Sequence, residues 1–70
     1  MKLYELLITA SSNAITLVKD NKSKKANAYG KTSEIMKSLS RDDNKLFMKE
    51  VVEFYTDFRM NMMILVVLVE

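Results

Sequence analysis

The chain has 70 residues and a formal net charge of +2 at pH 7, and 49% of its residues are apolar. This length predicts one domain over residues 1–70, and the apolar content excludes an intrinsically disordered chain. Cysteine and histidine are absent, which excludes disulfides, cysteine-based metal sites and catalysis by a histidine base.

The first half of the chain predicts a helix followed by a β-hairpin. Apolar side chains at spacings of three and four predict an amphipathic helix over residues 2–10. β-branched residues predict a strand over residues 14–19, and alternating residues predict a second strand over residues 25–29, after a polar turn. We expect the small side chains of Ala26 and Ala28 to face inward, where they leave room for a helix.

The second half predicts another helix and ends in an unbroken apolar run. Thr32 and Ser33 carry hydroxyl groups that can cap a helix over residues 32–39. Residues 40–45 follow as a polar connector or as a single helical turn, and they lead to Leu46. The run over residues 62–69 is typical of a strand that is buried on both faces, because a strand with one solvated face alternates between apolar and polar residues.

Residues 49–57 fit two structures. As a strand, they place alternate side chains on two faces. As a helix, they contribute to an apolar stripe at spacings of three and four, made of Phe47, Val51, Phe54, Phe58, Met62 and Leu65. We favour the strand, because β-branched and aromatic residues dominate this part of the chain and the final run then pairs with it as a hairpin.

Together these elements predict an α+β domain, in which a four-stranded, mostly antiparallel sheet carries two helices on one face in the order αββαββ. Two short helices cover one face of such a sheet and leave the other face of the last strand bare. We expect that face to meet its own copy in a homo-oligomer, most simply a dimer, or to be reserved for a host partner. The interface residues are then Leu65, Val67 and Val69.

Basic residues are concentrated in the first predicted hairpin. Residues 1–31 contain six lysines and two acidic residues, whereas residues 32–70 contain five basic and seven acidic residues. The hairpin fits contact with nucleic acid, with a nucleotide or with an acidic protein surface. It also fits a solvated loop whose lysines keep the protein in solution. The residues of this candidate site are Lys19, Lys22, Lys24, Lys25, Tyr29 and Lys31.

Catalytic chemistry has little support in the sequence. The single glycine excludes the glycine-rich loops that bind phosphate groups. Asp42, Asp43, Glu50 and Glu53 offer oxygen ligands for Mg²⁺ or Ca²⁺, but they lack the spacing of an EF-hand loop and fit solvated charges better. We therefore expect no enzyme, no bound metal and no cofactor. The six methionines fit either an adaptable binding surface or a gap-filling core.

Several stretches resemble small uncharacterised proteins of phages and prophages, namely MKLYELL at residues 1–7, ASSNA at residues 10–14, GKTSEI at residues 30–35 and EVVEF at residues 50–54. The resemblance implies a phage or bacterial setting and the helix, hairpin, helix, hairpin order, and it carries over no functional residue. Some small phage proteins of this size inhibit host defence by binding a defence protein or a signalling nucleotide. We expect a location in the bacterial cytoplasm without a membrane anchor, since the N-terminal residues lack the apolar stretch of a secretion signal.

The leading hypothesis is a non-enzymatic binding protein of a phage or mobile element, which occupies a surface of a host protein and thereby inhibits a defence system. Its basis is the lack of catalytic motifs, together with more apolar surface than a monomer of this size easily buries. One alternative is a small basic protein that binds nucleic acid or sequesters a nucleotide. Another is a self-assembling structural protein.

Overall fold

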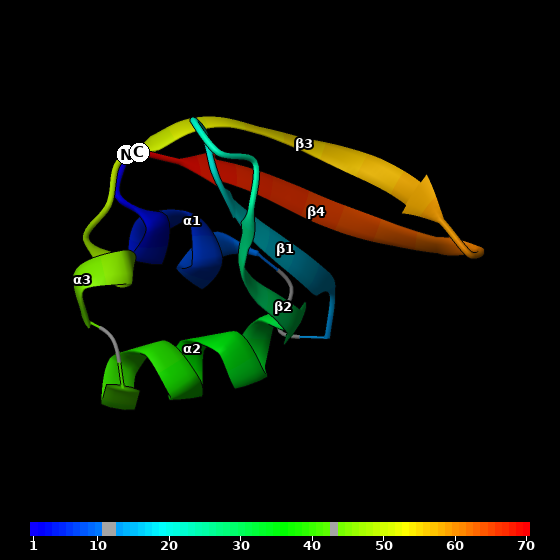
Figure 1. The fold of residues 1–70 in the computed structure, drawn as a ribbon. Helices are drawn as coiled ribbons and strands as arrows, with labels where there is room; N and C mark the ends of the chain where they lie inside the picture. The colour runs from blue at the N-terminus through cyan, green and yellow to red at the C-terminus, as the bar shows by residue number, and fades with distance from the viewer. Residues whose placement is uncertain (11–12, 43) are drawn as a thin grey trace.

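The computed structural model describes residues 1–10, 13–42 and 44–70, with the side chains of residues 39–44 left out. The fold is α+β, and the described part of the chain forms a four-stranded mixed sheet and three short helices. In chain order the elements are α1 (Leu3–Thr9), β1 (Ile15–Asp20), β2 (Ala26–Lys31), α2 (Thr32–Asp42), α3 (Asn44–Phe47), β3 (Val51–Arg59) and β4 (Met62–Val69). Figure 1 shows the helices gathered at one end of the sheet, while the β3–β4 hairpin extends away from them.

The apolar run at the end of the chain forms β4, which lies inside the sheet. The strand order is β2-β1-β4-β3, so β4 has a neighbour on each side. It pairs antiparallel with β3 and parallel with β1. The prediction that this run is a strand inside the sheet is confirmed, and residues 64 and 66–69 are buried, whereas Met62 and Met63 are exposed. The parallel pairing at the centre of the sheet could not be predicted from the sequence. Periodicity indicates which side chains share a face of a strand, but not which strands are neighbours.

The segment that fitted both a strand and a helix is a strand. Val51–Arg59 pairs with β4 along its length, apart from a bulge between Val51 and Glu53. The two strands are joined by Met60 and Asn61, whose φ angles are +51° and +61°. Two successive left-handed residues form the tight turn that joins twisted antiparallel strands.

The main core lies between the sheet and the helices. The three helices contribute Leu3, Leu6, Leu7, Ile35 and Leu46, and the sheet contributes Val18, Val67 and Val69. Leu46 shows why the predicted order αββαββ is not matched. It is only 5% exposed, and it anchors α3, which begins at Asn44 inside the segment predicted as a polar connector or a single turn.

A buried hydroxyl pair joins the β1–β2 hairpin to α2. The Oγ1 atoms of Thr16 and Thr32 are 2.8 Å apart, and both residues are fully buried. Thr32 also donates from Oγ1 to the carbonyl oxygen of Ala14. Ala28 packs against the core as expected, whereas Ala26 is exposed. The start of α2 is therefore held directly on the sheet.

Residues 1–3 are bound to the start of β3. The Leu3 amide donates to the carbonyl of Lys49, and the Val51 amide donates to the carbonyl of Met1. Both chain ends lie beside this point (Figure 1). Among the described helices, none has the length and apolar character required to cross a membrane.

Candidate functional site

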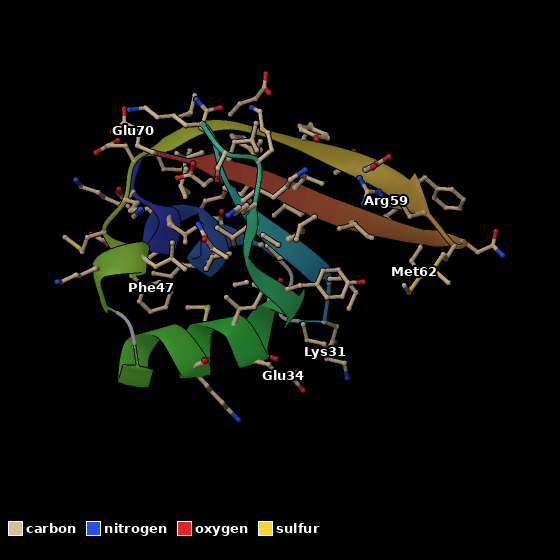
Figure 2. The ribbon with its side chains drawn as sticks, in the orientation of Figure 1. Lys31, Glu34, Phe47, Arg59, Met62 and Glu70 are labelled. Atoms are coloured by element: carbon tan, nitrogen blue, oxygen red, sulfur yellow. The ribbon has the colours of Figure 1, made fainter. Side chains whose placement is uncertain are left out.

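The predicted basic site is divided between the two ends of the β1–β2 hairpin. Lys22, Lys24 and Lys25 lie in the connection between the strands and are exposed. Lys31 ends β2 and pairs with Ile15 at the opposite end of the hairpin. Figure 2 shows Lys31 near Glu34, where β2 joins α2.

The remaining two members, Lys19 and Tyr29, lie between these ends. Tyr29 pairs with Leu17, and Lys19 shares a face of β1 with Leu17 because side chains alternate. The structure therefore brings together three of the six predicted residues, in one turn.

That turn is organised by Asp20. Its Oδ2 atom accepts hydrogen bonds from the amides of Lys22, at 3.0 Å, and Ser23, at 2.8 Å. The hydrogen bond from the Ser23 amide is the main cause that holds the pKa of the Asp20 carboxyl below its ordinary value. Lys24 adopts a left-handed φ of +62°. These contacts explain the polar composition of the turn by its local folding.

The predicted oligomer interface needs correction. Val67 and Val69 are fully buried in the core beneath the helices, and Leu65 packs against the same core. The helices cover this face of β4, so it is not available to a second copy. The alternation of β4 identified two apolar faces, but nothing in a strand's own sequence tells which of them the helices cover.

The opposite face of the sheet, which we call the open face, has a buried apolar centre. Leu17, Ile64 and Val66 form a small buried cluster there. Tyr29 pairs with Leu17, and Tyr55 pairs with Val66, which places a tyrosine on each side of the cluster. The open face therefore has a narrow apolar centre between the side chains of Tyr29 and Tyr55.

A group of large exposed apolar side chains lies on the β3–β4 hairpin. Phe54, Phe58 and Met63 lie on the face that the helices cover elsewhere, and Met60 lies in the turn. Phe54 pairs with the core residue Val67, and Phe58 pairs with Met63. Phe54 is 48% exposed, Phe58 62%, Met63 57%, and Met60 in the turn 90%. We call these four residues the hairpin patch. Figure 2 shows the labelled neighbours Arg59 and Met62 toward the far end of the hairpin, remote from Phe47 on α3.

The sequence contained part of the signal for this patch. The methionines near the end of the chain were recognised as fitting either an adaptable surface or a core. In addition, Phe54 and Phe58 alternate with polar residues in a strand, which would have placed them on one face. The missing information was the position of the helices, since the same face is buried at Val67 and exposed at Met63.

Ionisable side chains that the structure describes form ion pairs at the start of β3. Within the described residues, no group of three or more acidic side chains is placed to hold a metal ion. Asp42 and Asp43 lie outside the described side chains. Glu50 is held in ion pairs by the Met1 amine and by Lys2 Nζ, each at 3.0 Å. The hydrogen bond from Lys2 is the main cause that lowers the pKa of Glu50, and the same bond raises the pKa of Lys2.

The described surface has shallow hollows, one of which lies between β2 and α2. Its volume is about 290 Å³, and its lining residues are Asn27, Ala28, Tyr29, Glu34, Ile35 and Ser38. The polar groups of its lining are one carboxylate, one phenol, one hydroxyl and one side-chain amide.

The chain matches no family model, no curated protein and no solved structure. The resemblance to small phage and prophage proteins stays a prediction from the sequence.

Proposed function

We propose that this chain is a non-enzymatic protein-binding module that occupies a surface of another protein through its hairpin patch. The observation that carries the proposal is the exposure of Phe54, Phe58, Met60 and Met63 together on one projecting hairpin. Apolar groups gathered at one place on a small domain mark interaction surfaces more often than chance exposure does. Aromatic and methionine side chains are also enriched at the centres of protein interfaces.

The backbone of Met60 provides independent support. Its φ of +51° lies in the left-handed region, which costs an L-residue about 1–2 kcal/mol unless it is glycine, asparagine or aspartate. Tight hairpin turns therefore favour asparagine or glycine at this position. A methionine that is 90% exposed there gains little from packing within the chain. A contact outside the chain accounts for its presence.

The partner that fits this patch is a protein with an apolar groove. The four patch residues carry no charge, and the neighbouring Arg59 guanidinium is held by Asp57, with 2.7 Å between Nε and Oδ2. Phosphate recognition requires free basic groups, so the patch is better suited to a protein than to nucleic acid. The setting of a phage protein acting on a host defence protein rests on the sequence resemblance alone.

A capture experiment with matched variants tests the proposal. The unmodified protein, a Met60→Ser, Met63→Ser variant and a control with Ile8→Ser and Met48→Ser are each used to capture proteins from a bacterial lysate. Ile8 and Met48 are also exposed, at 63% and 53%, but they lie outside the hairpin. A captured protein is then purified, and its affinity for each form is measured by calorimetry.

We expect the patch variant to lose about tenfold or more in affinity, as truncation of central interface residues does, while the control stays within about twofold. The affinity should change little between low and high salt, whereas binding through lysines to nucleic acid falls steeply. Equal affinity of the patch variant and the unmodified protein contradicts the proposal, and so does capture that disappears at high salt.

A further inference from the structure

Strand β3 forms one edge of the sheet, and most of that edge is uncovered. No strand of the described chain lies beyond it. At its start, the amide of Val51 is bound by the carbonyl of Met1, so residues 1–3 close that end. The free edge therefore comprises residues 53–59, and its midpoint is Thr56.

The geometry of the β3–β4 turn indicates which backbone groups of β3 are directed to the free edge. In a hairpin with a two-residue loop, the two residues that flank the loop direct their backbone groups at each other. Here these residues are Arg59 and Met62. Backbone direction alternates along a strand, so Phe54, Thr56 and Phe58 direct their N–H and C=O groups to the free edge. Unpaired backbone groups in such a row are a template for another strand.

We propose that this edge binds the same edge of a second copy of the chain, antiparallel, about a two-fold axis at Thr56. This register uses the whole free edge of both copies. It places Phe54 of each copy opposite Phe58 of the other, on the helix-side face. It also places Glu53 opposite Arg59 of the second copy, on the open face. Opposite charges and aromatic pairs at facing positions each stabilise an antiparallel sheet.

The neighbouring registers lack this charge complementarity. A two-fold axis at Tyr55 places Glu53 opposite Asp57, so that two carboxylates face each other. An axis at Asp57 places that carboxylate opposite its own copy. Like charges at directly facing positions destabilise a strand pair. The sequence of charges along β3 therefore selects the register that is centred on Thr56.

The resulting dimer is one continuous sheet of eight strands, with the helices of both copies on the same face. Because the two β3 strands run in opposite directions, the two groups of helices lie at opposite ends of the joined hairpins. Both hairpin patches then line the floor between them. This inference does not depend on the host-partner proposal, but it explains how four exposed residues become a larger apolar surface. It also moves the expected dimer contact from the buried face of β4 to the edge of β3.

Charge reversal tests the register with the full chain. The dimer dissociation constant of the unmodified protein is measured by analytical ultracentrifugation and compared with those of Glu53→Arg, of Arg59→Glu and of the double variant. Each single change places like charges together twice in the symmetric dimer, which should weaken association about tenfold or more. The double variant restores opposite charges and should return to within about threefold of the unmodified protein. Failure of the double variant to recover overturns the register.

A backbone variant tests the edge itself. Thr56→Pro removes an outward N–H, which an isolated edge strand tolerates but which the proposed pair needs at its centre. We expect about a hundredfold weaker association or more with unchanged circular dichroism, while the control Thr56→Val, which keeps the N–H, still dimerises.

If Thr56→Pro unfolds the chain, amide hydrogen exchange of Phe54, Thr56 and Phe58 in the unmodified protein replaces this test. Protection of these amides that rises with protein concentration supports the proposal. An unmodified protein that stays monomeric at millimolar concentration, or amides that show no such protection, would overturn it. Neither result bears on Met60 and Met63, so failure here leaves the host-partner test intact.

Discussion

The two hairpins of this small sheet have opposite relations to the rest of the molecule. The β1–β2 hairpin lies against α2 and is tied to it by the Thr16 and Thr32 hydroxyls, and its edge strand β2 is short and carries Lys31 and Gly30. The β3–β4 hairpin extends past the helices (Figure 1) and carries most of the exposed large apolar side chains. Lysine is a common device that keeps a sheet edge from pairing. The edge strand β2 has one in Lys31, whereas the free part of β3 has none.

The same contrast occurs within one strand. Val67 and Met63 lie on the same face of β4, yet Val67 is fully buried and Met63 is 57% exposed. The difference arises because the helices reach only one end of the strand. Position along the hairpin, and not residue type, therefore separates the folding role of β4 from its proposed binding role.

The largest effect should come from a charge at the buried end of β4. Val67→Lys places an ammonium group in the core without a partner, which should lower the free energy of unfolding by more than about 3 kcal/mol. Met63→Lys, on the same face at the exposed end, should change it by about 0.5 kcal/mol or less. Urea unfolding followed by circular dichroism measures both. Equal effects of the two substitutions would abolish the distinction between the two ends.

The anchor of the β1–β2 hairpin should show an asymmetry between its two hydroxyls. Thr32 donates to the carbonyl of Ala14, so in their contact it accepts from Thr16. Thr32→Val leaves the Thr16 donor buried without an acceptor and should cost about 1–3 kcal/mol. Thr16→Val leaves the Thr32 donor satisfied and should cost about 1 kcal/mol or less. A larger loss for Thr16→Val, measured by the same unfolding experiment, would reverse the assigned donor.

The tip of the projecting hairpin should be stabilised by a residue that suits its left-handed backbone. Met60→Asn replaces a left-handed methionine by a residue that tolerates this conformation, and should raise the free energy of unfolding by about 1 kcal/mol. Lys24 is left-handed as well, so Lys24→Asn gives a matched comparison in the β1–β2 turn. If Met60 is kept for binding, Met60→Asn should stabilise the fold and weaken partner capture together. A variant that gains stability and still captures the partner fully would remove Met60 from the site.

The smallest effect concerns pH and the base of β3. The pKa of Glu50 is lowered in the folded chain, chiefly by the hydrogen bond from Lys2. Its contribution to stability is therefore complete above the ordinary carboxyl pKa of about 4.3 and is lost as the pH falls through the lower folded value. Thermal unfolding across the acidic range should show a shallower loss for Glu50→Gln than for the unmodified protein. Glu70→Gln serves as the control, and an identical profile for Glu50→Gln would rule out this contribution.

Much of the local structure could be predicted from the residues. β4 occupies the whole of the apolar run, and the other elements except α3 begin within a few residues of their predicted positions. The four turn residues from Asp20 to Ser23 are polar for reasons that the Asp20 hydrogen bonds explain. Of the candidate site, the sequence predicted a basic group and an apolar face, and neither is the surface that the structure favours.

The sequence by itself determined the segments that form α1, β1, β2, α2 and β4, and that β4 lies inside the sheet, because side-chain periodicity and local turn chemistry are properties of neighbouring residues. Only the tertiary structure decided which face of β4 the helices cover, that β1 and β4 run parallel, and how far the β3–β4 hairpin extends beyond the core. These outcomes depend on contacts between residues far apart in the chain, such as Val18 with Val67 and Ile35 with Leu7 in one core. The exposure of Phe54 and Phe58, and with it the candidate site, follows from that distant packing.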